Sequence, residues 1–267
     1  YHFKAFKNDP SNPKSISSND IKCVFEDKQG DIYFGSNGGG LSIYNKYTET
    51  FTNLRSGLSS NSLSNNIIRD IIEVSSNELL ISTASGINLY NKSNKSFKQI
   101  FFNDEQEEVG FTTFFKDSYN NIWIGSEANY IFEYDVKKSR LINYELPLRF
   151  IEIDKHNSNL NNRRKSIFNI TQQKGNLICG SDDGLLFFDI KTKTFINTFS
   201  FDEKNRYNNR VKCFVHSNDS SKLMFGTWGG LVKLNLNDFS YTIEKKIETS
   251  INSLSSDKIS CILNDKQ

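Results

Sequence analysis

One short element returns five times along this chain and constrains its fold more than any other feature. It runs apolar, any residue, apolar, Gly or Ser, then Ser or Thr, over residues 32–36, 79–83, 122–126, 177–181 and 223–227. Its fourth residues follow one another at intervals of 47, 43, 55 and 46 residues. Repeats of about 40–50 residues are typical of four-stranded propeller blades.

Each copy of the element holds the same place in a larger unit. An apolar strand and a polar turn precede it, as at 21–25 and 27–30, and a strand usually led by Gly follows it, as at 40–45. In the third unit Tyr130 replaces the leading Gly. The turn residues are of the kinds that favour tight hairpins. Outermost strands are then expected around Phe51, Phe97, Leu141, Phe195 and Tyr241.

Four short strands per unit predict an all-β chain, a β-propeller of four-stranded antiparallel blades. A flat sheet of about twenty strands would expose long edges, whereas radial repetition leaves short ones. No segment has the apolar periodicity of a convincing helix. We expect one propeller region over 1–267, a partial propeller cut from a longer array. Its expected parts are an outer strand of a preceding blade at 1–14, blades at 15–61, 62–108, 109–162, 163–208 and 209–252, and the first strand of a next blade at 253–267.

The two ends are predicted to be interrupted blades. Residues 1–6 have the pattern of an outermost strand without its blade, and residues 259–263 that of an innermost strand with nothing after it. A junction motif, Ser-Ile/Leu-Ser-x-x-x-Ile, begins at Ser15, Ser62 and Ser253. Exposed strand edges favour self-association, which we therefore expect.

These motifs together resemble the two-component regulator propeller repeat. That repeat runs Ser-Leu-Ser, a strand, Glu-Asp-x-x-Gly, apolar-Trp-apolar-Gly-Thr and Gly-Gly-Leu…Tyr. The first unit matches best, with Glu26-Asp27 and Gly30, then Gly40-Leu41 and Tyr44. The third unit has Trp123 at the Trp position, and the fifth has Gly229-Gly230-Leu231. The departures are Tyr33, Leu80, Ile178 and Met224 at the Trp position, and extra chain over 146–165.

The resemblance implies a function as well as a fold. Proteins with this repeat are periplasmic sensor regions of hybrid two-component histidine kinases of Bacteroidetes-type bacteria. Two seven-bladed propellers there precede an immunoglobulin-like module, a membrane helix and the kinase. The resemblance thus implies a non-catalytic sensor that binds an oligosaccharide, acts as a homodimer and controls polysaccharide-utilisation genes. It also implies that the membrane is reached only through segments outside this chain.

Composition excludes several other classes of protein. The chain has 33 basic and 31 acidic residues and a net charge of +2. A nucleic-acid binder needs a basic face, so none is expected here. His2, His156 and His216 lie far apart, and no spacing typical of a transition-metal site occurs. We expect no metal and no cofactor.

The four cysteines are predicted to be small core residues rather than disulfides. Cys23, Cys213 and Cys261 share one repeat position in the middle of the innermost strand. Cys179 occupies a buried position of a second strand. Separate blades are expected to hold the first three too far apart for a bridge, which needs Cα atoms within about 7 Å.

Ligand-binding candidates come from two sets of loops on one face and from the extra chain. Loops between second and third strands hold Asn37, Glu127, Asn129, Tyr130, Asp182, Asp183 and Trp228. Trp228 either stacks on a sugar ring or packs against a neighbouring blade. Innermost strands begin with Lys22, Arg69 and Lys212, which form either an anion-attracting entrance or simple edge charges. The extra chain adds Arg163 and Arg164.

Three functions are compatible with these patterns. The first is the glycan-sensing region of a hybrid kinase, and the second is a scaffold that binds proteins on the propeller face. The third is a polysaccharide lyase or glycosidase propeller. Catalysis of that third kind needs a histidine and carboxylate constellation that the sequence lacks.

Overall fold

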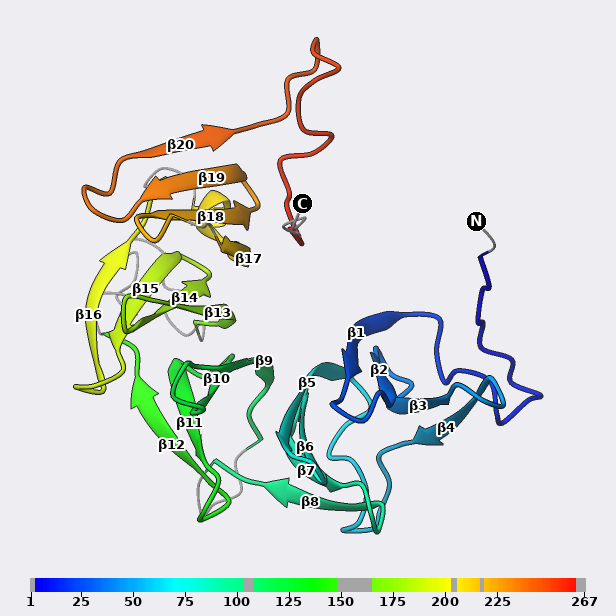
Figure 1. The fold of residues 1–267 in the computed structure, drawn as a ribbon. Helices are drawn as coiled ribbons and strands as arrows, with labels where there is room; N and C mark the ends of the chain where they lie inside the picture. Colours follow the sequence, from blue (N-terminus) through cyan, green and yellow to red (C-terminus); the bar gives the residue numbers. More distant parts are fainter. Residues whose placement is uncertain (1–2, 103–107, 148–164, 203–205, 217–218, 263–267) are drawn as a thin grey trace, which may run out of the picture. The chain divides into compact units, whose positions relative to one another are not determined.

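The computed structural model describes residues 3–102, 108–147, 165–202, 206–216 and 219–262. Over these residues it is a series of five four-stranded sheets (Figure 1). In every sheet the strands pair in chain order, so each is an antiparallel meander. The expected all-β fold of propeller blades is confirmed.

The chain divides into two compact units, and the first contains two complete sheets. This unit comprises residues 1–114 and 133–142. Its first sheet is β1 (Ile21–Glu26), β2 (Ile32–Ser36), β3 (Leu41–Asn45) and β4 (Thr50–Leu54). Its second sheet is β5 (Ile68–Ser75), β6 (Glu78–Thr83), β7 (Gly86–Asn91) and β8 (Ser96–Ile100).

The second unit comprises residues 115–132 and 143–267 and also contains two complete sheets. One is β13 (Ile167–Gln173), β14 (Asn176–Ser181), β15 (Gly184–Asp189) and β16 (Thr194–Phe199). The other is β17 (Val211–His216), β18 (Lys222–Thr227), β19 (Gly230–Asn235) and β20 (Tyr241–Glu244), preceded by the short 3₁₀ helix η2 (Arg206–Asn209). The third sheet is divided between the two units. It is formed by β9 (Phe111–Lys116), β10 (Ile122–Ser126), β11 (Tyr130–Asp135) and β12 (Arg140–Glu145).

The glycine of the repeated element is where one repeat packs closely on the next. A Cβ atom added to Gly35 would lie 2.5 Å from Cγ2 of Ile68, which begins the following innermost strand. In the second unit a Cβ on Gly180 would lie 2.7 Å from Cγ1 of Val211. Glycine is therefore required by the close approach of neighbouring repeats, which explains why it recurs.

In two repeats, an aspartate in the first hairpin turn accepts a hydrogen bond from the residue at the Trp position. Oδ2 of Asp117 accepts a hydrogen bond of 2.9 Å from Nε1 of Trp123, while Oδ1 accepts two backbone N–H groups of its turn. In the first repeat Oδ2 of Asp27 accepts a 3.1 Å bond from the hydroxyl of Tyr33. Both carboxylates are buried. Tyr33 thus replaces Trp but keeps a donor for the same carboxylate, whereas Leu80 and its counterparts have none.

The junction motif connects each blade entrance to the third strand of the same blade. Ile16 and Leu63, its central apolar residues, are buried. The backbone N–H of Ser17 donates to Oγ of Ser42 at 3.1 Å, and that of Ser64 donates to Oδ1 of Asn88 at 2.9 Å. These bonds satisfy polar groups that would otherwise be unpaired beneath the loop.

The interrupted terminal blades predicted at 1–6 and 259–263 remain a prediction, although no strand is assigned over their described residues. Residues 3–6 form no strand, although the Phe6 ring packs edge-on against Tyr44 at 5.3 Å. Residues 259–262 form none either, although the N–H of Ile259 donates to the carbonyl of Thr227. A strand requires a continuous ladder with a partner, and neither segment has one.

Burial of the cysteines follows the prediction only in part. Cys179 and Cys213 are buried, Cys23 is half-buried, and Cys261 is exposed. The core position predicted for Cys261 is therefore wrong, because residues 259–262 pair with no second strand that would cover it. All four are free thiols, and burial raises the pKa of Cys213 to about 11.

Candidate functional site

The loops between second and third strands share a common frame. In all five, the Ser or Thr that ends the repeated element donates its hydroxyl to the carbonyl of the residue that begins the third strand or, in the first repeat, immediately precedes it, at 2.7–2.9 Å. The next residue occupies one equivalent position and differs in each repeat: Asn37, Ala84, Glu127, Asp182 and Trp228. Loops that share one hydrogen bond but differ in the residue that follows it are expected of binding loops on a rigid scaffold.

The innermost strands carry a β-bulge at the second position of four repeats. The register shifts between Ile21 and Cys23 of β1, and equivalent shifts occur in β5, β13 and β17. The extra residues are Lys22, Arg69, Phe168 and Lys212. Bulges re-aim side chains and are frequent beside functional sites. The three predicted cations thus share a local geometry as well as a repeat position.

In the first unit Asp20 brings two of the predicted residues together. Its Oδ2 accepts a 2.8 Å hydrogen bond from Nδ2 of Asn37, and its Oδ1 lies 3.0 Å from Nζ of Lys22. The bond from Asn37, followed by that from Lys22, lowers the pKa of Asp20. Lys22 is therefore part of an exposed ion pair, and Arg69 also has an interaction partner.

In the second unit a larger group forms, which we name the cation–aromatic cluster: Phe168, Arg210, Lys212, Trp228 and Lys258. The Arg210 guanidinium carbon lies 4.4 Å from the centre of the Trp228 ring and 5.0 Å from that of Phe168. Nζ of Lys212 lies 3.2 Å from the Phe168 centre, and Nζ of Lys258 lies 5.3 Å from the Trp228 centre. Cations are attracted to the faces of aromatic rings at such distances.

The two adjacent aspartates of the fourth repeat are both engaged with cations. Oδ1 of Asp182 accepts a 2.7 Å hydrogen bond from Nε of Arg210, and Oδ2 accepts the N–H of Ser166 at 3.0 Å. Asp183 pairs with the Lys165 ammonium. Asp182 thereby links the fourth repeat to the cation–aromatic cluster, while Asp183 stays outside that cluster.

The remaining predicted residues are placed as follows. Asn129 has a positive φ of 61° and accepts, through Oδ1, a 2.5 Å hydrogen bond from the N–H of Lys165. The Tyr130 ring lies 5.8 Å from that of Phe132, and Glu127 is half-buried and has an interaction partner. Arg163 and Arg164 lie outside the described residues. Within the second unit, then, Trp228, Lys212 and Asp182 come together around Arg210.

Sequence reasoning missed Arg210, Phe168, Lys258 and Asp20. Arg210, Lys258 and Asp20 share one repeat position, two residues before that of Lys22 and Lys212, so a search of that position would have found them. Phe168 is the apolar exception at the bulge position of Lys212. Its role as a platform for cations has no signal in the sequence.

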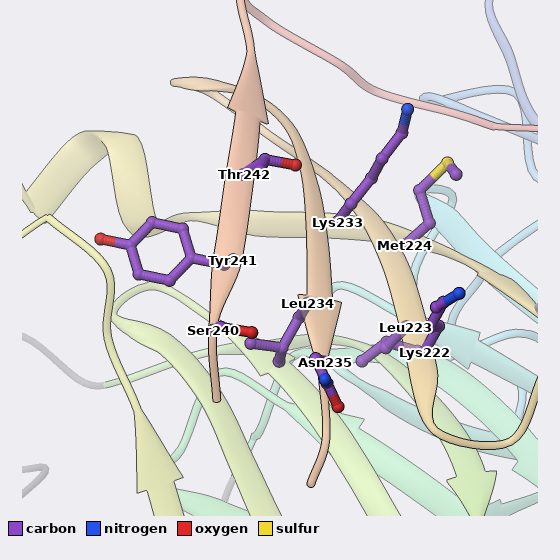
Figure 2. Close-up of a pocket in the computed structure, with 9 residues that line it drawn as sticks. All are labelled: Lys222, Leu223, Met224, Lys233, Leu234, Asn235, Ser240, Tyr241 and Thr242. Atoms are coloured by element: carbon purple, nitrogen blue, oxygen red, sulfur yellow. The ribbon is translucent and has the colours of Figure 1, made fainter. Parts of the chain in front are cut away.

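A hollow of about 410 Å³ lies apart from all these residues, on the fifth sheet (Figure 2). It is lined by β18, β19 and the start of β20, including Met224, Lys233 and Thr242. Met224 pairs with Lys233, and Lys233 with Thr242, so these three side chains share one face of the sheet. None of the predicted ligand-binding residues lines this hollow.

Asp70 follows Arg69 in the innermost strand β5, and the pKa of its carboxyl group reports how the innermost strands pack. Its carboxylate accepts the N–H of Phe114 at 2.7 Å and the Thr113 hydroxyl, yet burial raises its pKa to about 6.

A raised pKa means that the folded state disfavours ionised Asp70. Its contribution to stability is therefore present below about pH 4 and decreases as the pH rises to about 6. We expect Asp70→Asn to flatten this part of the pH profile in thermal unfolding followed by circular dichroism. Parallel profiles for the two proteins between pH 4 and 6 would contradict the assignment.

One short segment of the chain matches the model of a known family. Residues 15–38, which hold the first junction motif, β1 and the start of the second-to-third-strand loop, match the family described as two component regulator propeller. The chain carries a two-component regulator propeller repeat. No curated protein matches this chain in sequence.

Solved structures with a similar fold are found at low sequence identity. The extracellular domain of BT3049 from B. thetaiotaomicron, described as a hybrid two component system, is 19% identical with a TM-score of 0.66, over 86% of this chain and 31% of that one. The extracellular domain of BT4673 from the same organism, described as a one component system, is 14% identical with a TM-score of 0.68, over 92% and 30%. The chain thus spans about a third of the length of these structures. No helix among its described residues is long and apolar enough to cross a membrane.

Proposed function

We propose that this chain is part of the periplasmic sensing region of a hybrid two-component system and binds an oligosaccharide. The repeat type is that of non-catalytic sensing domains, and the structural neighbours are extracellular domains. The observation that supports oligosaccharide binding is Trp228, a half-buried indole in the loop between the second and third strands, beside two cations. Aromatic and charged groups on rigid loops are typical of binding sites.

The geometry suggests how binding would be converted into a signal. The cation–aromatic cluster joins residues of successive repeats: Phe168 from the fourth, Arg210, Lys212 and Trp228 from the fifth, and Lys258 from the segment after it. A ligand changes a conformational equilibrium only if it binds the two states with different affinity. A ligand that spans these segments would favour the state in which they are drawn together. The proposal includes a homodimer, which light scattering of the sensing region would detect.

Trp228 gives a fluorescence test of the proposal, because Trp228→Phe removes its emission and leaves that of Trp123, the other tryptophan of this chain. Trp123 is fully buried, whereas Trp228 is half-buried on the loop face. We expect a bound oligosaccharide to raise the unfolding temperature of the full-length sensing region and to change its tryptophan emission. Trp228→Phe should abolish the emission change, whereas the matched variant Trp123→Phe should keep it.

Two results would contradict the glycan proposal. One is a panel of oligosaccharides of which none stabilises the full-length sensing region. The other is an emission change that survives in Trp228→Phe, which would place the ligand elsewhere. Tight capture of a protein partner by this face, without any effect of glycans, would instead support the scaffold alternative.

A further inference from the structure

Two cysteines occupy the same repeat position on either side of one boundary between repeats. Cys213 is the third residue of the innermost strand β17, and Cys261 holds the equivalent place in the segment after the fifth sheet. Both are free thiols in the structure, with Cys213 buried and Cys261 exposed. Along the chain this position is occupied by Cys23, Asp70, Thr113, Asn169, Cys213 and Cys261. Only the last two neighbours are both cysteines.

Side chains at this position contact the next repeat elsewhere in the chain. Oδ2 of Asp70 lies 3.3 Å from the hydroxyl oxygen of Thr113, its counterpart in the following repeat. Nδ2 of Asn169 donates a 3.4 Å hydrogen bond to the carbonyl of Lys212, the residue before Cys213. The position is therefore one at which neighbouring innermost strands touch through side chains, and a disulfide between repeats needs contact of this kind.

The Cys213 thiol faces the segment that contains Cys261. A Cβ atom added to Gly226 would lie 2.7 Å from Sγ of Cys213 and 2.5 Å from Cγ2 of Ile259, so these two atoms are at most 5.2 Å apart. Cys261 follows Ile259 by two residues. Burial raises the pKa of the Cys213 thiol to about 11, and the charge of Cys261 adds to that rise. The two thiols are therefore close enough to interact.

The backbone around Cys261 can bring its thiol to Cys213 without breaking a sheet. The N–H of Ile259 donates to the carbonyl of Thr227 at 2.8 Å, which holds the start of the segment against the fifth sheet. Residues 259–262 form no strand, so Cys261 belongs to no ladder among the described residues. Its exposure also lets an oxidant reach it. Because the two repeats approach so closely at Gly226, separate blades do not keep these cysteines apart, contrary to the expectation from sequence.

We propose that Cys213 and Cys261 form a disulfide when the chain meets a disulfide oxidant, as is common outside the cytoplasm. The Cys261 thiolate attacks the S–S bond of the oxidant, which gives a mixed disulfide and releases one oxidant thiol. Cys213 then loses its proton and attacks Sγ of Cys261, and the second oxidant thiol leaves. The two electrons and two protons lost by the cysteines are recovered in the two oxidant thiols. The new bond ties residues 259–262 to β17.

Oxidised glutathione, added to the reduced full chain, tests the proposal. Free thiols are then blocked by alkylation, and the protein is analysed by mass spectrometry before and after digestion. We expect a single chain lighter by about 2 Da, the two hydrogen atoms lost, with Cys213 and Cys261 in one linked peptide pair. Below the Cys213 pKa of about 11, closure should become about tenfold faster for each unit of pH, because the thiolate is the nucleophile.

Two single variants locate the bond. Cys261→Ser should abolish the linked peptide pair, and since Cys261 is exposed the substitution leaves the core intact. Cys23→Ser is the matched control, because it lies at the same repeat position but its neighbour in the next repeat is Asp70. The control should keep the linked pair and the loss of mass.

Two results would overturn the proposal. One is a glutathione adduct that persists on Cys261 while Cys213 stays reduced. The other is a link between Cys261 residues of two chains in place of the link within one chain. Neither result bears on oligosaccharide binding, which is measured on the reduced protein, so the disulfide and the proposed sensing function can fail separately.

Discussion

Trp123→Ala is expected to lower the free energy of unfolding by about 3–5 kcal/mol, as large aromatic deletions in cores do. The indole is fully buried and lies 5.3 Å, ring centre to ring centre, from Phe188 of the next repeat. Its Nε1 donates to Asp117, so the substitution also removes a hydrogen bond from a buried carboxylate. The cavity and the lost hydrogen bond act in the same direction.

Urea unfolding followed by circular dichroism measures this effect. Trp123→Phe should cost less, because it keeps most of the volume and loses mainly the hydrogen bond to Asp117. Tyr119→Ala, in the same turn but 66% exposed, is the control and should change stability by no more than about 0.5 kcal/mol. Equal losses for Trp123→Ala and Tyr119→Ala would show that the repeat does not depend on this core position.

Gly35→Ala is expected to lower the free energy of unfolding by about 1–3 kcal/mol, the usual cost of overpacking. The new methyl group would lie 2.5 Å from both Sγ of Cys23 and Cγ2 of Ile68. Ile68 is fully buried and belongs to the core between the first two sheets, so it cannot move aside cheaply. The substitution therefore forces apart two neighbouring blades rather than one turn.

Gly57→Ala is the matched control for Gly35→Ala. A Cβ atom there has no neighbour nearer than Oγ of Ser62 at 4.0 Å, and the residue is exposed. We expect a change within about 0.5 kcal/mol for this surface site. If Gly35→Ala unfolded at the same urea concentration as Gly57→Ala, close packing at the repeated glycine would not explain its recurrence.

The order of strands was predictable because its signals are local. Alternating apolar residues, hairpin turns such as 27–30 and the recurring Gly-Ser/Thr element each depend on a few adjacent residues. The predicted terminal strands are a different case, because their pairing is not local. Residues 3–6 and 259–262 have strand-like sequences, but a strand exists only where a partner supplies the ladder, and no local pattern reports that.

The candidate site was predictable in position but only partly in composition. The loop face and Trp228, Lys212 and Asp182 follow from repeat positions, which the sequence records directly. That Arg210 links Trp228 to Asp182 could not be foreseen, because it requires distances between side chains of different repeats.

What the sequence alone determined about this protein is its architecture: five repeats, their register and the loops that vary between them. Periodicity determines these, since each blade is built from contacts among residues close in the chain. Only the tertiary structure decided which charges meet. A cation over an aromatic ring depends on how one repeat packs against the next, and sequence spacing carries no such distance. The recurring glycine is visible as a pattern in the sequence, but its reason, the close approach of Ile68 to Gly35, is visible only in the fold.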